Sequence, residues 1–116
     1  MDIKGIRDKL RDFAAERNWD QFHSPKNLSM ALAAEAAELL EIFQWLTEEQ
    51  SQNIADSEKD MALVKEEIAD IFIYLVRLAD KLNVDIEKAV LEKIKTNEKK
   101  YPVKLSKNSA VKYSRR

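Results

Sequence analysis

The sequence of 116 residues contains no cysteine, one glycine, two prolines and one histidine. The absence of cysteine excludes disulfides, a thiolate nucleophile and a zinc–thiolate site. So little glycine and proline argues against β-hairpins and favours long helices. A single histidine excludes the paired Glu-x-x-His motifs of a di-iron helical bundle. No glycine-rich phosphate loop is present, which excludes P-loop and dinucleotide-binding folds.

Long apolar runs and an excess of charge of one sign are also missing. The longest strongly apolar run, residues 71–76, is far too short to span a membrane. Residues 1–4 do not begin an apolar signal segment. The net charge is only −1, which argues against broad nucleic-acid binding. We therefore expect a cytoplasmic protein that binds neither membranes nor nucleic acid.

The apolar residues that are present recur at helical spacing and predict an all-α fold with four main helices. The predicted helices cover residues 2–18, 25–46, 56–82 and 85–101. Ser24 and Pro25 are a typical N-cap and first residue for the second helix. Thr47 begins a short helical turn that extends to about Ala55. Pro102 ends the fourth helix, because proline continues a helix poorly.

Length and charge define the expected domain organisation. A chain of this length makes one domain, and we assign it residues 1–102, with residues 103–116 as a basic, irregular tail. Residues 48–70 contain eight acids and two lysines, a balance of −6, whereas residues 93–116 contain nine Lys/Arg and one Glu, a balance of +8. The basic end is expected to be a solvated terminus, with local phosphate binding as the alternative.

Two pairs of acidic residues stand out in the second and third predicted helices. Glu35 and Glu38, and likewise Glu67 and Asp70, are three residues apart, so each pair shares one helix face. Glu35 falls in the middle of the apolar stripe of its helix. A carboxylate aimed at a core is costly unless it is paired or binds a cation. Solvated helix faces and buried Glu–Lys or Glu–Arg pairs are the alternatives.

Oxygen ligands without cysteine or histidine suit a hard cation, Mg²⁺ or else Mn²⁺. The third helix is expected to bury an apolar stripe beside its acids, while the acids form a row with Tyr74 along one flank of that stripe. The expected stripe is Met61, Val64, Ile68, Phe72, Leu75, Ala79 and Leu82.

Several motifs together resemble a known family. They are Glu35-Ala36-Ala37-Glu38, Phe43-Gln44-Trp45, Glu66-Glu67-Ile68-Ala69-Asp70, Trp19-Asp20-Gln21-Phe22-His23, Lys93-Ile94-Lys95-Thr96-Asn97 and Tyr101-Pro102. The chain resembles, over nearly its whole length, the all-α nucleoside triphosphate pyrophosphohydrolases of the MazG-type superfamily. It is most similar to the small dCTP pyrophosphatase branch.

The resemblance implies a four-helix bundle of that type, assembled as a homo-oligomer, which we expect to be a homotetramer built as a dimer of dimers. It implies that residues 1–102 form the catalytic domain. The implied reaction converts a nucleoside triphosphate, such as dCTP or a related or modified deoxynucleotide, to the monophosphate and pyrophosphate. Glu35, Glu38, Glu67 and Asp70 would then be the metal ligands.

The resemblance also implies a substrate site made of three aromatic residues, a histidine, a lysine and an asparagine. They are Trp19, Trp45, Tyr74, His23, Lys93 and Asn97. The aromatic side chains would line the nucleoside pocket with the histidine near it, because aromatic faces stack on bases. The lysine and asparagine, one helical turn apart, would meet phosphate oxygens or the sugar. Plain core packing is the alternative for each aromatic residue.

The general base is left open, since an ion-activated water or any of the four acids could serve; our choice is Glu38. Two rival functions also stay open. One is a non-catalytic, oligomeric helical interaction module whose acids pair with the basic tail. The other is a related enzyme that acts on dUTP or phosphoribosyl-ATP.

Overall fold

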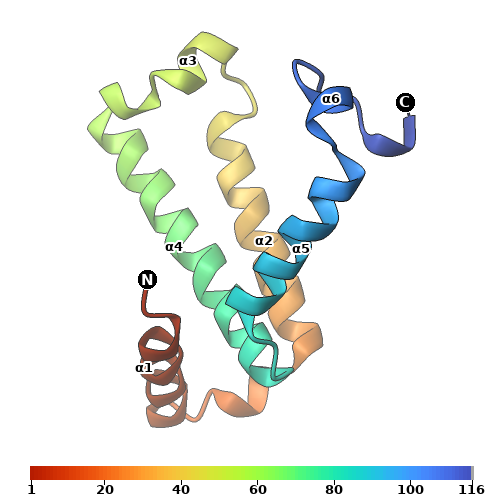
Figure 1. Ribbon diagram of the computed structural model, residues 1–116. Coiled ribbons are helices and arrows are strands. Elements are labelled where there is room, and N and C mark those ends of the chain that lie inside the picture. The colour runs from red at the N-terminus through yellow and green to blue at the C-terminus, as the bar shows by residue number, and fades with distance from the viewer. Residues whose placement is uncertain (116) are drawn as a thin grey trace. The chain divides into compact units, whose positions relative to one another are not determined.

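The computed structural model describes residues 1–115, which form helices and connecting segments without a β-strand (Figure 1). The predicted all-α class is therefore confirmed. The chain divides into two compact units, residues 1–83 and residues 84–116. No helix within the described part of the chain is long and apolar enough to cross a bilayer.

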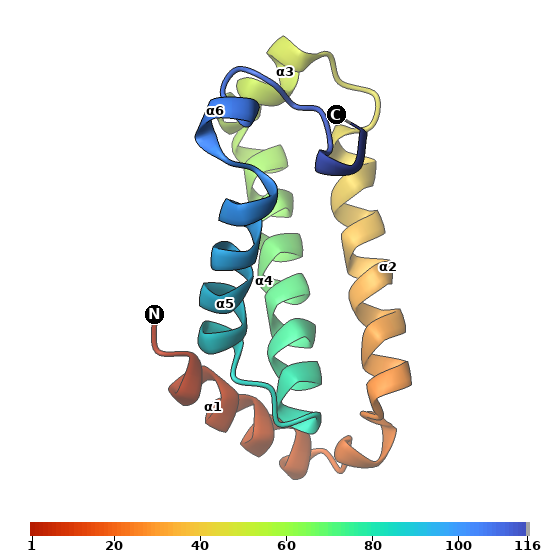
Figure 2. The same ribbon diagram turned by 45° about the vertical axis from the view of Figure 1, so that its right-hand side comes forward.

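The first unit contains three long helices and three short helical elements. They are α1 (Ile3–Glu16), η1 (Asp20–Phe22), α2 (Pro25–Phe43), α3 (Glu48–Gln52), η2 (Ile54–Asp56) and α4 (Glu58–Lys81). The antiparallel helices α2 and α4 lie side by side in both views (Figures 1 and 2). Helix α1 contacts α4 near the C-terminal end of α4, where Arg11 pairs with Asp80.

The predicted starts of α2 and α3 agree with the structure because local side chains set them. The Ser24 hydroxyl accepts a hydrogen bond from the backbone N–H of Asn27 at 3.1 Å, and Pro25 is the first residue of α2. Thr47 forms a capping box with Gln50 at the start of α3, which satisfies two backbone donors that the helix leaves unpaired. Helix α2 ends at Phe43, earlier than the expected residue 46.

The core of the first unit is small. Its buried residues are Ala14, Leu28, Val64, Val76, Ala79 and Arg77. The predicted stripe of α4 is wrong in part, since Ile68 and Leu82 are each 54% and Leu75 is 38% exposed. The reason is that Glu67 points towards α2. Ile68 follows it by about 100° around the helix and therefore points elsewhere.

The second unit contains α5 (Ile86–Lys100), α6 (Val103–Ser106) and η3 (Tyr113–Arg115). Asp85 caps α5 by accepting a hydrogen bond from the backbone N–H of Lys88 at 3.0 Å. The segment expected to be irregular includes α6 and η3 and is not wholly so. Within this segment, the Tyr113 ring meets that of Tyr101 edge-on with centroids 5.8 Å apart, and the Lys100 ammonium lies 4.7 Å from the Tyr113 ring centre.

The four main helices are thus present where the sequence predicts them. Packing of the fourth helix against the other three, the division of the chain at residue 102 and the homo-oligomer stay predictions.

Candidate functional site

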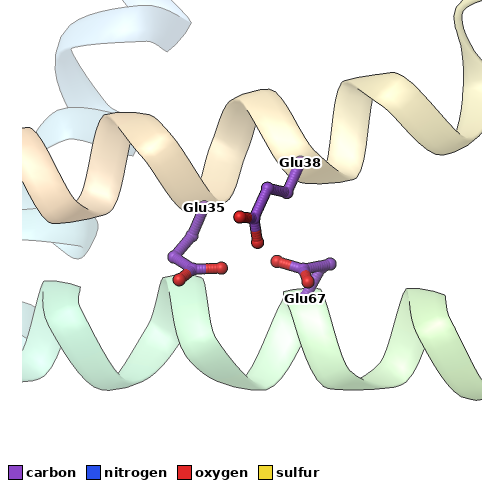
Figure 3. A group of neighbouring side chains, drawn as sticks. All are labelled: Glu35, Glu38 and Glu67. Carbon is purple, nitrogen blue, oxygen red and sulfur yellow. The ribbon is translucent and has the colours of Figure 1, made fainter.

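Three of the four predicted metal ligands meet between α2 and α4 (Figure 3). Glu35 and Glu38 project from α2 and Glu67 from α4. One carboxylate oxygen from each lies within 4.8 Å of the other two. The three-residue spacing places both α2 acids on one face, and the antiparallel pairing of the helices brings Glu67 opposite them.

Two oxygens in this cluster lack partners. Glu35 Oε2 and Glu67 Oε2 are buried and have no hydrogen-bond partner among the described residues. Within residues 1–83, no lysine or arginine forms an ion pair with Glu35, Glu38 or Glu67. A buried carboxylate oxygen without a donor is costly. The cluster therefore requires a proton or a cation.

The electrostatics of the acidic cluster point the same way. The pKa of Glu35 is raised, first by its contact with Glu67 and then by burial. The pKa of Glu38 is also raised, chiefly by Glu35. Both shifts arise because Glu35 and Glu38 lie close to other carboxylates, which disfavours their charged forms. An oxygen-only donor set of this kind fits a hard divalent cation.

Asp70 is not part of the group of three. It is half-buried on α4, one turn beyond Glu67, and its charge contributes to the raised pKa of Glu35. It therefore lies near the cluster without bringing an oxygen into it. Its role as a fourth ligand stays a prediction.

The predicted aromatic residues lie on opposite sides of the acids. Trp45 follows the end of α2 and is 87% exposed. It is seven residues beyond Glu38 along the chain. Trp19 and His23 precede the start of α2, at the other end of the helix pair. Tyr74, half-buried on α4, lies on the His23 side of the acids.

Trp19 is sheltered by helix α1. Its ring meets the Phe13 ring edge-on, with centroids 5.8 Å apart and planes inclined at 71°. The Arg17 guanidinium lies 3.6 Å from the centre of the Phe13 ring. Trp19 is 45% exposed, so part of its ring stays available to a ligand. Trp19 is therefore not a core residue.

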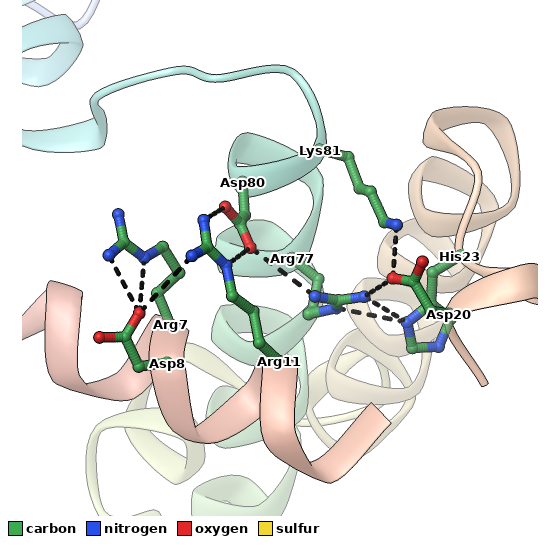
Figure 4. Close-up of polar contacts among 8 residues, drawn as sticks. All are labelled: Arg7, Asp8, Arg11, Asp20, His23, Arg77, Asp80 and Lys81. Atoms are coloured by element: carbon green, nitrogen blue, oxygen red, sulfur yellow. Dashed lines mark hydrogen bonds and ion pairs between the residues drawn. The ribbon is translucent and has the colours of Figure 1, made fainter. Parts of the chain in front are cut away.

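His23 contacts a residue that the sequence did not single out. The Nδ1 atom of His23 lies 3.3 Å from Arg77 Nε and 3.1 Å from Arg77 Nη2 (Figure 4). Arg77 is only 4% exposed. It also donates to Asp20 Oδ1 at 3.0 Å, and Lys81 donates to the same oxygen. The signal that could have found Arg77 is its place in the acidic row of α4, three residues after Tyr74.

The same network continues to helix α1 (Figure 4). Asp80 accepts from Arg11 and lies 3.7 Å from Arg77 Nη1. The hydrogen bond from Arg11 holds the pKa of Asp80 below its ordinary value. Lys81 and Arg77 likewise lower the pKa of Asp20. Both aspartates are therefore ionised at neutral pH and tie α1 and η1 to α4.

The remaining two predicted site residues belong to the second unit. Lys93 and Asn97 are exposed and lie one turn apart on α5. Their shared face is as predicted, and their contact with a substrate stays a prediction.

Comparison with known proteins adds independent information. The sequence model of the MazG-like family matches residues 30–115. The chain is 48% identical to dCTP pyrophosphatase 1 of Bos taurus and 43% identical to dCTP pyrophosphatase 1 of Homo sapiens, each over 112 residues. These alignments cover 97% of the chain but 66% of each relative. The crystal structure of a pyrophosphatase from Archaeoglobus fulgidus superimposes with a TM-score of 0.81 at 40% identity, over 88% of this chain and 94% of that one.

Proposed function

The chain belongs to the MazG-like family, and on that premise we propose that it is a nucleoside triphosphate pyrophosphohydrolase whose substrate is dCTP or a related deoxynucleotide. Water adds to the α-phosphorus, the bond to the β-phosphate oxygen breaks, and the products are the monophosphate and pyrophosphate. The observation that supports this best is the meeting of Glu35, Glu38 and Glu67 within 4.8 Å. The named relatives are dCTP pyrophosphatases, which favours dCTP over dUTP or phosphoribosyl-ATP.

A divalent cation, Mg²⁺ or Mn²⁺, belongs to this proposal. The partnerless buried oxygens of Glu35 and Glu67 fit such an ion, and Glu38 and Asp70 would complete its ligands. When bound, the ion would offset part of the negative charge of the triphosphate and polarise its phosphoryl oxygens. Glu38 is the most exposed of the three clustered acids. Solvent water therefore reaches it first, which supports the second oxygen of Glu38, the one not on the ion, as the general base that accepts a proton from the attacking water.

The nucleoside is proposed to lie along α4. Tyr74 follows Asp70 by one turn towards the end of the helix pair where Trp19 and His23 lie. A triphosphate held by the acids would extend its nucleoside along this direction. Stacking on an aromatic ring contributes about 1–3 kcal/mol per base. Lys93 and Asn97 are proposed to meet phosphate or sugar oxygens.

Trp45 fits this pocket only if a second copy of the chain supplies it. Trp45 and Trp19 flank the acids on opposite sides, so one nucleotide cannot extend towards both within a single chain. We therefore propose a symmetric homo-oligomer, a tetramer built as a dimer of dimers, in which Trp45 approaches the site of another copy. The exposed apolar side chains on the long helices support this assembly. They are Met30, Leu40, Leu63, Ile68 and Leu75.

A product assay on purified protein tests the activity. The protein is incubated with each of a panel of nucleoside triphosphates, including dUTP and phosphoribosyl-ATP, in Mg²⁺. Monophosphate plus pyrophosphate is the expected product pair, with dCTP hydrolysed fastest and no activity in excess chelator. Diphosphate plus phosphate would contradict the reaction, and no hydrolysis of any nucleotide would favour the interaction module.

Light scattering at micromolar concentration tests the assembly. A mass of four chains is expected. A monomeric mass would contradict the proposed homo-oligomer and, with it, the shared site.

A further inference from the structure

The most buried charged side chain in the described residues, Arg77, has no part in the proposed reaction. We propose that Arg77 is a positioning residue for nucleotide binding. It fixes His23 as an Nε2–H donor and anchors the turn that holds Trp19. This inference rests on the proposed function, in which Trp19 and His23 meet the nucleoside.

The tautomer of His23 follows from its contacts. An arginine side chain can only donate hydrogen bonds. Two of its nitrogens, Nε at 3.3 Å and Nη2 at 3.1 Å, face His23 Nδ1. Nδ1 must therefore accept, so the proton of the neutral ring lies on Nε2. Among residues 1–83 this atom has no hydrogen-bond partner, so its N–H is available to donate to a ligand.

The anchoring of the Trp19 turn follows from the second contact of Arg77. Its Nη2 donates to Asp20 Oδ1 at 3.0 Å, and Asp20 directly follows Trp19. Asp20 and His23 bracket the turn, so a single buried guanidinium holds both ends of η1 against α4 (Figure 4). A planar, delocalised guanidinium can do this, whereas a lysine ammonium cannot reproduce its fork of donors.

The position of Arg77 along α4 links it to the acids. Glu67, Asp70, Tyr74, Arg77 and Lys81 follow one another at spacings of three and four residues and form one row on the helix. Every member of the row is buried or half-buried. Arg77 lies ten residues beyond Glu67, about 15 Å by the helical rise. A nucleotide whose phosphates meet the acids would thus direct its base towards His23.

The Nε2–H group of His23 favours a ligand that has a hydrogen-bond acceptor within reach of Nε2. A nucleobase ring nitrogen or carbonyl oxygen meets this requirement, and cytosine offers both, N3 and O2, each bonded to C2. An imidazolium ring would lose its acceptor at Nδ1 and face the Arg77 guanidinium with like charge. Nucleotide binding should therefore require neutral His23.

The surroundings of His23 favour the neutral ring. The charged side chains around it are Arg77, Lys81 and Asp80 of α4, Asp20 of its own turn and Arg11 of α1. Burial lowers the pKa of His23 most, the positive charge of Arg77 lowers it further, and Asp20 acts in the opposite direction. Loss of the Arg77 charge should therefore raise the pKa of His23.

The test combines NMR spectroscopy and kinetics on the full chain without an added tag. His23 is the only histidine, so its ring nitrogens in ¹⁵N-labelled protein are unambiguous. We expect the Nε2–H tautomer in the wild type at pH 7.5. Arg77→Gln should raise KM for dCTP about fivefold, as loss of one ordinary hydrogen bond does, change kcat less than twofold, and move the acid limb of kcat/KM to higher pH. Arg77→Lys should restore the pH profile but not KM.

Two further variants separate positioning from folding. Arg11→Gln removes a positive charge from the same network without touching His23 and should leave KM and the pH profile unchanged. His23→Asn keeps an acceptor for Arg77 where Nδ1 lies but has no donor at the Nε2 position. It should keep the melting temperature and raise KM about fivefold, so the inference stays testable if Arg77→Gln does not fold.

The results that contradict the role of Arg77 differ from those that contradict the proposed activity. An Nδ1–H tautomer in the wild type, or unchanged KM in a folded Arg77→Gln or His23→Asn variant of an active enzyme, would overturn the inference. A wild type that hydrolyses no nucleotide would instead overturn the proposed function.

Discussion

Replacing Trp45 with alanine should leave the fold intact and weaken nucleotide binding. Trp45 lies just past the end of α2 and is 87% exposed. A large aromatic side chain in solvent contributes little to folding and is available to stack on a base. The substitution therefore separates a pocket residue from a core residue.

The expected loss of stability follows from the exposure of Trp45. A buried aromatic side chain removes about 150–250 Å² from water, and only about one-eighth of Trp45 is sheltered. At about 25 cal/mol per Å² the loss is below about 1 kcal/mol, a shift of a few degrees in melting temperature. Leu28→Ala is the matched core control, because Leu28 is 1% exposed. It should cost about 2–5 kcal/mol.

The expected loss of affinity is larger. If the ring stacks on the base, its removal costs about 1–3 kcal/mol, which raises KM for dCTP about 5- to 150-fold. The value of kcat should change little, because the interaction is made equally in the ground state and the transition state. Melting temperature, steady-state kinetics and mass by light scattering are measured on the same preparation.

Two results would refute this reasoning. A loss of melting temperature comparable to that of Leu28→Ala, with normal KM in the folded fraction, would make Trp45 a structural residue. An unchanged KM in a fully folded oligomer would remove Trp45 from the nucleotide site.

Three further predictions concern the acids and the arginine network. Glu35→Gln should raise the melting temperature of the ion-free protein, because it removes one of three clustered carboxylates. The same substitution should abolish most Mg²⁺-dependent hydrolysis. A lower melting temperature together with full activity would contradict this prediction. Since the folded-state pKa of Glu35 and of Glu38 is raised above 4.5, their protonation favours the folded state. In chelator, the stability of the wild type relative to Glu35→Gln should therefore rise as pH falls from 7 towards about 4.5, and a difference independent of pH would count against the shift. Arg11→Ala should barely move the midpoint of urea unfolding, because an exposed ion pair contributes little, the Arg11 side chain is 50% exposed and Asp80 keeps Arg77; a large fall in the midpoint would show that Arg11 holds α1 in place.

Local chemistry explains which parts of the fold were predictable. Helix starts at Ser24, Thr47 and Asp85 depend on side chains that bond to a backbone N–H three residues away, so the sequence alone determines them. The acid pairs were predictable for the same reason, because three-residue spacing fixes their common face. That α2 and α4 bring these faces together is confirmed for Glu35, Glu38 and Glu67.

Tertiary packing explains what the sequence did not reveal. The rotation of α4 about its axis depends on which side chains the neighbouring helices present to it. Hydrophobic periodicity alone predicted that Ile68 would be buried. Arg77 was missed because an arginine in an apolar run is usually a surface residue. Its partners Asp20 and His23 are 57 and 54 residues away. The opposite placing of Trp19 and Trp45 likewise depends on the antiparallel pairing of whole helices.

The same rotation of α4 connects the acidic site to the proposed assembly. Glu67 faces α2, so the space between the two longest helices holds carboxylates where a helix pair would ordinarily bury apolar side chains. Ile68 and Leu75, on a neighbouring face, are left 54% and 38% exposed. A bound cation would offset the repulsion between the acids, but it cannot bury the apolar face. A second copy of the chain packed on that face would bury it. In each chain, Trp45 lies on the side of the acids opposite to Trp19 and His23, and the same assembly would place it near the nucleoside bound to another copy.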